Sequence, residues 1–340
     1  MIIEMGTTAT AKQIEMVTRE IKAVGLDFQI NEGRERTIIA VLGADIKKTF
    51  DPQKFKALPG VEDIIPISKP YKLASRDFKS EDTVIKIGGI EIGGKDVVLM
   101  AGPCSVEGES QIFRCAEVVK KAGGKILRGG AFKPRTSPYS FRGLKEQGLH
   151  FLRRAADQFG LLVVTEIMSV GSIKLVADYA DILQVGARNM QNYDLLEALN
   201  SCKKPVLLKR GPSAEIEEWF CAADYILNGS DTPNVILCER GMKTFERSTR
   251  YTLDIAAVPV AKRLSHLPIV IDPSHAAGNF RYVPALAKAA IAAGADGIIV
   301  EIHPEPKRAL SDGAQSLTFS DFARLSEELK VIASAIGRDM

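Results

Sequence analysis

The stretch "LRGGAFKPRTSPYSF", residues 127–141, places four side chains suited to binding phosphate directly after the apolar run "KIL". They are Arg128, Lys133, Arg135 and Thr136, and glycines and prolines lie around them with no helix-forming run. An apolar run that ends in a polar loop rich in glycine and proline is typical of a β-strand leaving the core. The same arrangement recurs along the chain, and its repetition decides the fold.

Eight apolar runs of this kind follow one another from residue 97 onward. They are "VVLMAGPC" (97–104), "KILRGGA" (125–131), "LLVVTEI" (161–167), "DILQVGA" (181–187), "PVLLKRG" (205–211), "VILCERG" (235–241), "IVIDPSH" (269–275) and "GIIVEIH" (297–303). Amphipathic segments separate the runs, and a last one, residues 318–337, closes the chain. Eight such units predict a (β/α)₈ TIM barrel over residues 97–340. An open doubly wound sheet is the alternative, but it is less consistent with eight even units and no G-x-G-x-x-G turn.

Residues 1–70 have a different rhythm, which predicts a small domain of their own. A strand, an amphipathic helix, a hairpin, a short helix and a last strand are expected at 1–5, 8–25, 27–43, 51–60 and 61–67. This βαββαβ order predicts a small α+β ferredoxin-like domain. It contains no His and no Cys, so we expect no catalysis there. Residues 71–96 are predicted to be a linker followed by a β-hairpin.

The composition narrows the class of protein. The 45 basic and 42 acidic residues give a net charge of +3, and no basic run or basic-aromatic stripe predicts nucleic-acid binding. The N-terminus does not resemble a signal peptide, and no apolar window predicts a transmembrane helix. Five scattered cysteines do not form a disulfide pattern, which favours the reducing cytoplasm.

Every predicted barrel strand ends in at least one side chain that can carry charge. The set is Cys104, Arg128 with Lys133 and Arg135, Glu166, Arg188, Lys209 with Arg210, Glu239 with Arg240, Asp272 with His275, and Glu301 with His303. One or two such residues would be ordinary at strand ends, but all eight strands show them. In a TIM barrel these ends meet on the face that carries the active site.

The first group of these residues is cationic. It comprises Arg128, Lys133, Arg135, Arg188, Lys209 and Arg240. For any single arginine, a surface ion pair is the simpler interpretation. Six cations in one pocket, however, would repel one another unless an anion neutralised them. The group therefore predicts substrates with several negative charges, most simply two phosphates and a carboxylate.

The second group is a set of metal-ligand types: Cys104, His275, Glu301 and Asp312. A thiolate, an imidazole and two carboxylates can bind one divalent ion such as Mn²⁺, Fe²⁺, Co²⁺ or Zn²⁺. A lone cysteine is more often a buried structural thiol, but its position at the same barrel mouth as the other three favours ligation. His303 is expected to cap its loop.

Two further histidines are weaker candidates. His266 precedes the seventh strand, at the end of the barrel where stability rather than catalysis is expected, and His150 is expected on a helix surface.

Taken together, "AGPCSVE", "LRGGAFKPRTSPYSF", "QVGARNMQN", "LLKRG", "CERG", "DPSH" and "VEIHPEP" with "ALSDGAQSL" resemble 3-deoxy-D-arabino-heptulosonate 7-phosphate (DAHP) synthase. The likeness covers the whole chain and is to the branch with a ferredoxin-like domain before the barrel. It implies condensation of phosphoenolpyruvate with erythrose 4-phosphate, the first step towards the aromatic amino acids. It also implies metal ligation by Cys104, His275, Glu301 and Asp312.

The resemblance assigns the remaining site residues as well. It implies phosphoenolpyruvate contacts at Arg128, Lys133, Arg188, Lys209 and Arg240, and it places the phosphate of erythrose 4-phosphate on Arg135 and Thr136. Lys133 is the candidate for proton transfer, and we expect the crowded cations to lower its pKa.

Two other functions stay open at this point. The related 3-deoxy-D-manno-octulosonate 8-phosphate synthase takes arabinose 5-phosphate, but its loop resembles "KANRSS" where this chain has "KPRTS", and many of its members lack the ligand cysteine. A sensor built on an inactive barrel would have lost a ligand or an anion contact, and none is missing. The resemblance further implies tyrosine or phenylalanine as an effector of the front domain, although a structural role is the alternative, and a homotetramer.

Overall fold

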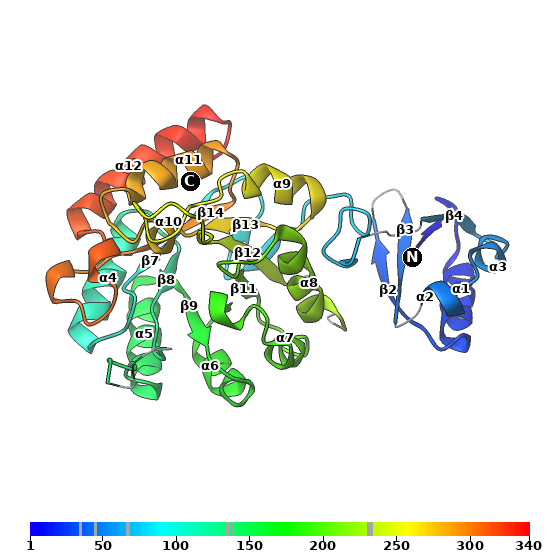
Figure 1. Cartoon of the computed structure of the whole chain (residues 1–340), viewed down its shortest axis with the longest axis horizontal. Helices are drawn as coiled ribbons and strands as arrows, with labels where there is room; N and C mark the ends of the chain where they lie inside the picture. Colours follow the sequence, from blue (N-terminus) through cyan, green and yellow to red (C-terminus); the bar gives the residue numbers. More distant parts are fainter. Residues whose placement is uncertain (34–35, 44–45, 66–68, 134–136, 138, 230–233) are drawn as a thin grey trace. The chain divides into compact units, whose positions relative to one another are not determined.

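The structure is a computed structural model, and it describes the 340-residue chain apart from residues 34–35, 44–45, 66–68, 134–136, 138 and 230–233 (Figure 1). The chain forms two compact units. The front unit comprises Met1–Asp82 together with Arg263–His266, and the barrel unit comprises Thr83–Lys262 together with Leu267–Met340. The boundary after Asp82 falls within residues 71–96, the stretch predicted as linker and hairpin.

The front unit has the predicted ferredoxin-like order. Its elements are β1 (Ile2–Met5), α1 (Ala11–Ala23), β2 (Asp27–Glu32), β3 (Thr37–Leu42), α2 (Ile46–Thr49), α3 (Pro52–Lys56) and β4 (Val61–Ile65). The strands form one antiparallel sheet in the order β2-β3-β1-β4. Asp51 starts α3 by accepting hydrogen bonds from the backbone N–H groups of Gln53 and Lys54. The short helix α2 was not predicted.

Apolar side chains from the sheet and the helices form the core of the front unit. The main members are Ile3, Met5, Val17, Ile21, Ile39, Val41, Phe50 and Phe55. Val17 and Ile21 stand one helical turn apart on α1, so both reach the same face of the sheet. The rings of Phe50 and Phe55 stack with their centroids 4.2 Å apart. Each such side chain contributes about 1.5–3 kcal/mol on burial.

His266, predicted to be structural, is buried in the front unit. Its Nε2–H donates to the carbonyl oxygen of Leu73 at 2.7 Å. Burial lowers the pKa of His266 to about 4. Because the unfolded chain takes up a proton below about pH 6.5 and the folded chain does not until about pH 4, folding stability contributed by this group is lost as the pH falls between these values.

We therefore expect acidification from about pH 7 to about pH 4 to remove about 3 kcal/mol through His266 alone. His266→Gln keeps an N–H donor for Leu73 but cannot titrate. Urea unfolding of both proteins at the two pH values measures this. Between them, the free energy of unfolding should fall by about 3 kcal/mol more in the parent chain than in the variant. Equal losses in both proteins would rule out His266 as the source.

The second unit is the predicted TIM barrel. Eight parallel strands close on themselves in the order β10-β11-β12-β13-β14-β7-β8-β9, which excludes the open sheet. They are β7 (Val98–Gly102), β8 (Ile126–Arg128), β9 (Leu162–Ile167), β10 (Ile182–Val185), β11 (Val206–Lys209), β12 (Val235–Glu239), β13 (Ile269–Ile271) and β14 (Gly297–Glu301). Nearly all of their residues are buried, as expected for strands covered on both faces.

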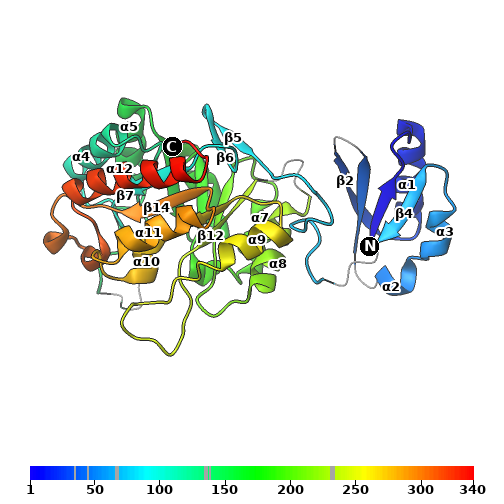
Figure 2. The ribbon, with the colours of Figure 1, turned by 90° about the horizontal axis from the view of Figure 1, so that it is seen from above.

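Helices surround the barrel on the outside (Figures 1 and 2). They are α4 (Glu109–Lys121), α5 (Glu146–Phe159), α6 (Ile173–Tyr179), α7 (Tyr193–Leu199), α8 (Ile216–Leu227), α9 (Ala257–Leu264), α11 (Val283–Ala292) and α12 (Phe319–Ala335). The short helix α10 (Pro273–Ala277) follows β13 at the carboxyl end of the strands. Short 3₁₀ turns η1 (Val170–Ser172), η2 (Ala187–Asn189), η3 (Pro306–Arg308) and η4 (Gly313–Gln315) lie in the loops. None of the described helices combines the length and apolar composition needed to cross a membrane.

A two-stranded hairpin closes one end of the barrel. Its strands β5 (Ile85–Ile87) and β6 (Ile90–Ile92) pair antiparallel around Gly88 and Gly89, which both have positive φ. A Cβ on Gly88 would lie 2.6 Å from the side chain of Leu162, at the start of β9. The hairpin therefore lies at the amino-terminal end of the strands, where Ile85 and Ile92 join the apolar cluster that fills the barrel. The opposite end is left for chemistry.

Candidate active site

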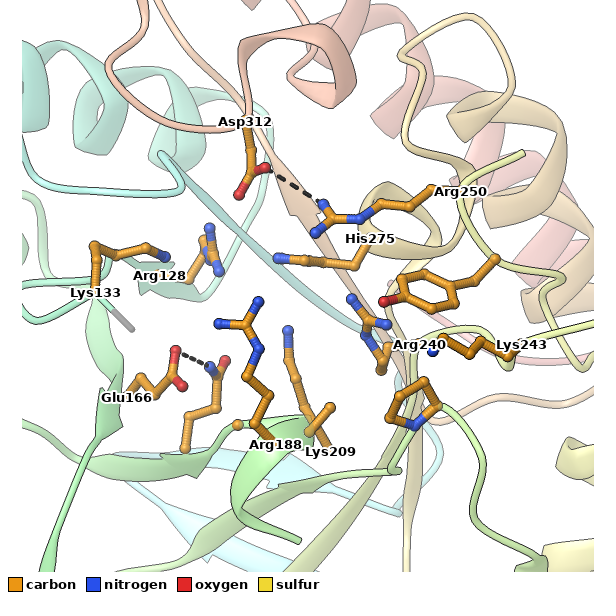
Figure 3. Close-up of a pocket in the computed structure, with 15 residues that line it drawn as sticks. Arg128, Lys133, Glu166, Arg188, Lys209, Arg240, Lys243, Arg250, His275 and Asp312 are labelled. Atoms are coloured by element: carbon orange, nitrogen blue, oxygen red, sulfur yellow. Dashed lines mark hydrogen bonds and ion pairs between the residues drawn. The ribbon is translucent and has the colours of Figure 1, made fainter. Parts of the chain in front are cut away.

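A cavity of about 340 Å³ opens where the carboxyl ends of the barrel strands meet (Figure 3). Strand ends and the loops that follow them supply its lining. The lining residues are Arg128, Lys133, Glu166, Gln184, Gly186, Ala187, Arg188, Lys209, Pro212, Arg240, Lys243, Arg250, Tyr251, His275 and Asp312. The cavity thus unites residues that are up to 184 positions apart in the sequence (128 to 312).

The predicted cations that the structure describes all line this cavity: Arg128, Lys133, Arg188, Lys209 and Arg240. Figure 3 shows the side chains of Lys133, Arg188 and Lys209 extending towards the same central space. Arg128 and Lys209 are only 4% and 3% exposed, so they form the deep part of the cavity. Arg135 and Thr136 lie outside the described residues.

The expectation that only an anion could neutralise the cations needs correction. Arg128 Nη1 lies 2.6 Å from Glu301 Oε1, and Lys209 forms an ion pair with Asp272, both within the protein. These carboxylates come from β14 and from the residue after β13, on neighbouring strands. Two of the deep cations are therefore neutralised by carboxylates of the protein itself. Such pairing is expected, since an unpaired buried charge would cost several kcal/mol.

Of the lining residues that the sequence did not predict, three come from one loop: Lys243, Arg250 and Tyr251. This is the long β12–α9 loop, residues 240–256, and all three lie beyond the end of β12. The guanidinium of Arg240 lies 4.3 Å from the ring centroid of Tyr251 and forms a cation–π contact. The basic sequence "GMKTFERSTRY" directly after "CER" was the signal that could have revealed them.

A buried ion network fixes both ends of the β12–α9 loop. Glu239 Oε1 accepts hydrogen bonds from the N–H groups of Gly241 and Asp254, at 2.6 and 3.3 Å. Arg210 Nη1 lies 3.2 Å from Glu239 Oε2 and 2.9 Å from Asp254 Oδ2. Burial raises the pKa of Glu239, although Arg210 opposes this. Arg210 and Glu239 thus hold the loop in place and do not line the cavity.

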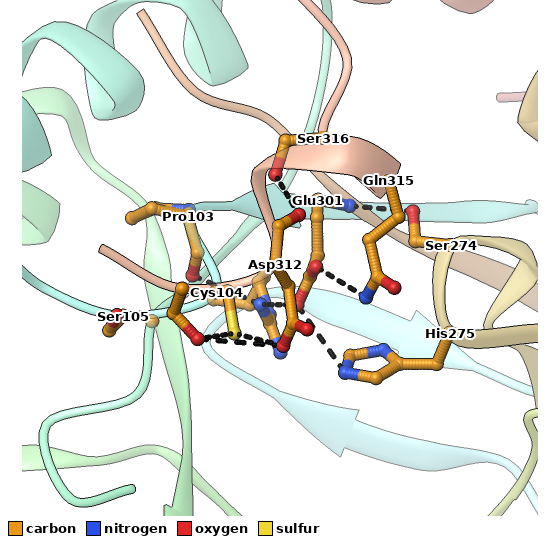
Figure 4. A network of polar contacts seen from close by, with 12 residues as sticks. Pro103, Cys104, Ser105, Ser274, His275, Glu301, Asp312, Gln315 and Ser316 are labelled. Carbon is orange, nitrogen blue, oxygen red and sulfur yellow. Dashed lines mark hydrogen bonds and ion pairs between the residues drawn. The ribbon is translucent and has the colours of Figure 1, made fainter. Parts of the chain in front are cut away.

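The predicted metal ligands gather at one side of the same mouth (Figure 4). Donor atoms of Cys104, Glu301 and Asp312 all lie within 4.8 Å of one another. Cys104 Sγ lies 3.0 Å from Asp312 Oδ2. His275 approaches from α10, with Nε2 3.4 Å from Glu301 Oε1. The structure therefore brings together three of the four, with the fourth at their edge.

Buried partners orient His275 and Glu301. Asp272 caps α10 by accepting from the backbone N–H of His275 at 3.0 Å, and its other oxygen accepts from His275 Nδ1 at 2.7 Å. The proton on Nδ1 leaves Nε2 with a lone pair towards the cluster. Burial lowers the pKa of His275, which keeps the ring neutral. Gln315 donates to Glu301 Oε2 at 2.7 Å.

This donor set fits a divalent ion. A thiol, a neutral imidazole and two carboxylates are the ligand types that borderline transition metals accept. Burial raises the pKa of the Cys104 thiol to about 12, so in this arrangement the thiol carries its proton and donates it towards Asp312. Binding of a metal to the sulfur would release that proton.

The pKa of Lys133 is shifted in the direction opposite to the one predicted. Burial acts to lower its pKa, but the nearby Cys104, Glu166 and Glu301 outweigh burial, and the net pKa is raised. The prediction of a lowered pKa was wrong because it counted cations and omitted the carboxylates of Glu166 and Glu301. Lys133 Nζ donates to the carbonyl oxygen of Cys104 at 3.1 Å.

A glycine permits the close approach of the first two strands. Gly102 at the end of β7 has φ +155°, and a Cβ there would lie 1.9 Å from the carbonyl oxygen of Arg128. A side chain at this position would push β7 away from β8. Gly102 therefore allows Cys104 and Arg128 to emerge side by side.

The remaining histidines follow their predictions. His303 Nδ1 accepts from the N–H of Glu305 at 3.0 Å, within its own loop. His150 lies on α5, and its Nε2 is 2.9 Å from the hydroxyl of Tyr179. Neither His150 nor His266 lines the cavity.

Comparison with known families fits this site and fold. The model of the "DAHP synthetase I family" matches residues 76–336, and that of the "DAHP synthase ferredoxin-like domain" matches residues 1–69. The chain belongs to the DAHP synthetase I family. The second match places a ferredoxin-like domain of DAHP synthases in front of the barrel, as predicted.

Individual relatives show the same pattern. The chain is 50% identical over 337 residues to a phospho-2-dehydro-3-deoxyheptonate aldolase of Thermotoga maritima, covering 99% of both chains. A 2-dehydro-3-deoxyphosphooctonate aldolase of Geobacter sulfurreducens is 32% identical over 271 residues, 74% of this chain and 98% of that one. The similarity to DAHP synthases thus includes the front domain, and the similarity to this octonate aldolase is weaker and covers less of the chain.

Solved structures agree. The crystal structure of the Thermotoga maritima DAHP synthase matches with a TM-score of 0.79 and 49% identity, covering 99% of this chain and 98% of that one. A truncated form of the Thermotoga enzyme matches with a TM-score of 0.74 and 50% identity, covering 79% of this chain and 98% of that one.

Proposed function

We infer that the chain is a DAHP synthase, a transferase that condenses phosphoenolpyruvate with erythrose 4-phosphate to give DAHP and inorganic phosphate. One observation carries this conclusion. A deep cation-lined cavity directly adjoins a thiol–carboxylate–imidazole cluster, in a chain that is 50% identical along its length to a relative named for this product.

We assign the metal ligands as Cys104, His275, Glu301 and Asp312, for one Mn²⁺, Fe²⁺, Co²⁺ or Zn²⁺ ion. When bound, such an ion supplies Lewis-acid polarisation of the aldehyde oxygen. The geometric support is the convergence of their donor atoms and the buried Asp272 that orients the His275 ring.

The deep cations are assigned to phosphoenolpyruvate: Arg128, Lys133, Arg188, Lys209 and Arg240. Arginines can hold a carboxylate or a phosphate through two parallel hydrogen bonds, which fixes the orientation of the substrate. Arg135 and Thr136 are assigned to the phosphate of erythrose 4-phosphate. This last assignment rests on the "KPRTS" sequence.

The chemistry requires one proton donor near the new hydroxyl. C3 of phosphoenolpyruvate forms a bond to the aldehyde carbon, water adds at C2, and phosphate leaves with its bridging oxygen. The raised pKa of Lys133 keeps its ammonium protonated, and its Nζ lies beside the Cys104 backbone. We therefore assign Lys133 as the group that donates a proton to the aldehyde oxygen as the carbon–carbon bond forms.

The proposal extends to regulation and assembly. The front domain is proposed to bind tyrosine or phenylalanine as a feedback inhibitor, on the strength of its family match. We also propose a homotetramer and a cytoplasmic location, and the five cysteines, all described and all free, are consistent with a reducing compartment.

Phosphate release from phosphoenolpyruvate tests the function directly. We expect turnover with erythrose 4-phosphate when Mn²⁺ is added, and none with arabinose 5-phosphate or in the presence of a chelator. Turnover with the five-carbon sugar would instead assign the octulosonate reaction. Full activity in chelator would contradict the metal assignment while leaving the substrates in place, and no turnover with either sugar would indicate an inactive barrel.

A further inference from the structure

The loop that carries Asp312 has a second anchor that the proposed chemistry does not use. This loop, residues 302–318, is called the strap here, and it joins β14 to α12. Its base is closed by pairing of Ile302 with Leu317 and by the hydrogen bond from His303 N to Leu317 O, 3.0 Å long. At its far end Asp312 has φ +50°, a left-handed conformation that most residues with a side chain avoid and that Asp adopts in suitable surroundings. The carboxylate of Asp312 contacts Arg250 and Cys104, which both lie outside the strap.

Glu107 supplies such contacts from the loop that carries Cys104. This β7–α4 loop spans residues 103–108. Glu107 Oε1 accepts from the N–H of Leu310 at 2.8 Å, and Glu107 Oε2 lies 3.3 Å from His303 Nε2. Because His303 Nδ1 accepts from the N–H of Glu305, its Nε2 carries the proton and donates to Glu107. A single carboxylate thus binds the strap at two points.

The β7–α4 loop is itself held firmly. The N–H of Glu107 donates to Gln111 Oε1, and Gln111 Nε2 donates to the carbonyl oxygen of Ser105, both at 3.1 Å. Gly130 N donates to Cys104 O at 3.1 Å, and Val106 N donates to Gly130 O at 3.0 Å. Glu107 therefore projects from a rigid base that also fixes the backbone of Cys104.

Burial strengthens the link between the two loops. The side chains of Glu107 and His303 are 13% and 7% exposed, so water screens their contact little. Glu107 is three residues from Cys104, and Leu310 is two residues from Asp312. The hydrogen bond between Glu107 and Leu310 therefore joins the two loops close to the point where the Cys104 sulfur and the Asp312 carboxylate lie 3.0 Å apart.

We propose that Glu107, together with His303, is a positioning residue that clamps the strap to the Cys104 loop and sets the spacing of two metal ligands. The inference rests on the proposed metal site. It gives a function to "SVE" and to the histidine of "EIHPEP", which the substrate and ligand assignments leave without one. Residues that do not bind the metal but hold its ligands in position typically contribute about 10- to 100-fold to metal affinity.

The test is titration of the metal-free full-length protein with Co²⁺ alone, read by the thiolate-to-cobalt absorption in the near ultraviolet. We expect Glu107→Ala to weaken Co²⁺ binding by about 10- to 100-fold and to reduce or shift this absorption. Glu109→Ala is the matched control, because this carboxylate lies two residues along the chain and pairs on the surface with Arg154. It should bind Co²⁺ like the parent.

A second pair of variants separates positioning from general stability. His303→Gln keeps an N–H donor for Glu107 and should bind Co²⁺ with nearly the affinity of the parent. His303→Leu removes the donor and should bind Co²⁺ more weakly. Glu107→Gln keeps an acceptor for the N–H of Leu310 but turns an N–H group towards His303 Nε2. It should therefore weaken Co²⁺ binding less than Glu107→Ala does, and it serves if Glu107→Ala does not fold. Parental affinity in His303→Leu together with parental affinity in Glu107→Ala, or in Glu107→Gln where the alanine variant does not fold, would overturn the proposal, even if these variants melt earlier than the parent. Failure of the parent itself to bind Co²⁺ would overturn the metal assignment and this proposal together.

Discussion

Replacement of Cys104 by serine is expected to lower DAHP synthesis roughly 1,000-fold and to abolish the thiolate absorption of a bound Co²⁺ ion. The hydroxyl keeps the shape of the thiol but is a poor ligand for borderline metals, which favour thiolate sulfur. Loss of correct Lewis-acid catalysis removes several kcal/mol of transition-state stabilisation, and each 1.36 kcal/mol is tenfold in rate. Steady-state rates at saturating Mn²⁺ measure the effect.

The chain provides a matched control for this change. Cys115 is also fully buried, but it lies on α4 away from the cluster. Cys115→Ser has the same chemistry and the same burial, so it measures the cost of a buried hydroxyl without loss of a ligand. We expect it to lower the melting temperature while activity of the folded protein persists. Equal loss of activity in the two variants would show that Cys104 acts only through folding.

Replacement of Lys133 by alanine is expected to lower kcat by about 10²- to 10⁴-fold while Co²⁺ affinity stays within about twofold of the parent. The side chain contributes both a proton and a charge. Lys133→Arg keeps the charge but cannot release a proton at neutral pH, because arginine stays protonated. It should therefore recover much of the KM for phosphoenolpyruvate and little of the kcat.

The comparison of the two Lys133 variants decides the assignment. If Lys133→Arg recovers kcat, the residue contributes charge alone, and the proton comes from elsewhere. If Lys133→Ala retains turnover, neither role holds. Metal titration of each variant is needed because Lys133 donates to the backbone of the ligand Cys104, so a displaced loop would show there first.

The barrel was predictable because of a simple regularity. Eight runs such as "LLVVTEI" are too short for helices, are apolar on both faces and end in polar loops, and parallel strands in a closed sheet have these properties. The same regularity places Cys104, His275 and Glu301 on one face without any knowledge of their contacts. The helix α2 was missed because four residues, Ile46–Thr49, show no periodicity.

Pairings across the barrel mouth were not predictable. The partners Arg128 with Glu301 and Lys209 with Asp272 depend on which strands are neighbours and on their register. The sign of the Lys133 pKa shift depends on the same contacts, so counting cations along the sequence gave the wrong direction. Lys243, Arg250 and Tyr251 were not predicted because they lie within a loop, away from any strand end, and reach the cavity only through the fold of that loop.

The hairpin at the amino-terminal end of the strands has a consequence for the passage of molecules. Ile85 and Ile92 belong to the apolar cluster that fills the barrel, so this end of the barrel is closed. Both substrates and both products therefore have to pass through the cavity mouth at the carboxyl end of the strands. The cations at its bottom, Arg128 and Lys209, are almost fully buried, whereas the Arg250 side chain nearer the rim is 39% exposed. We therefore expect the substrate that binds the deep cations to enter before a substrate that binds nearer the rim. The depth of the cations thus favours an ordered binding of the two substrates.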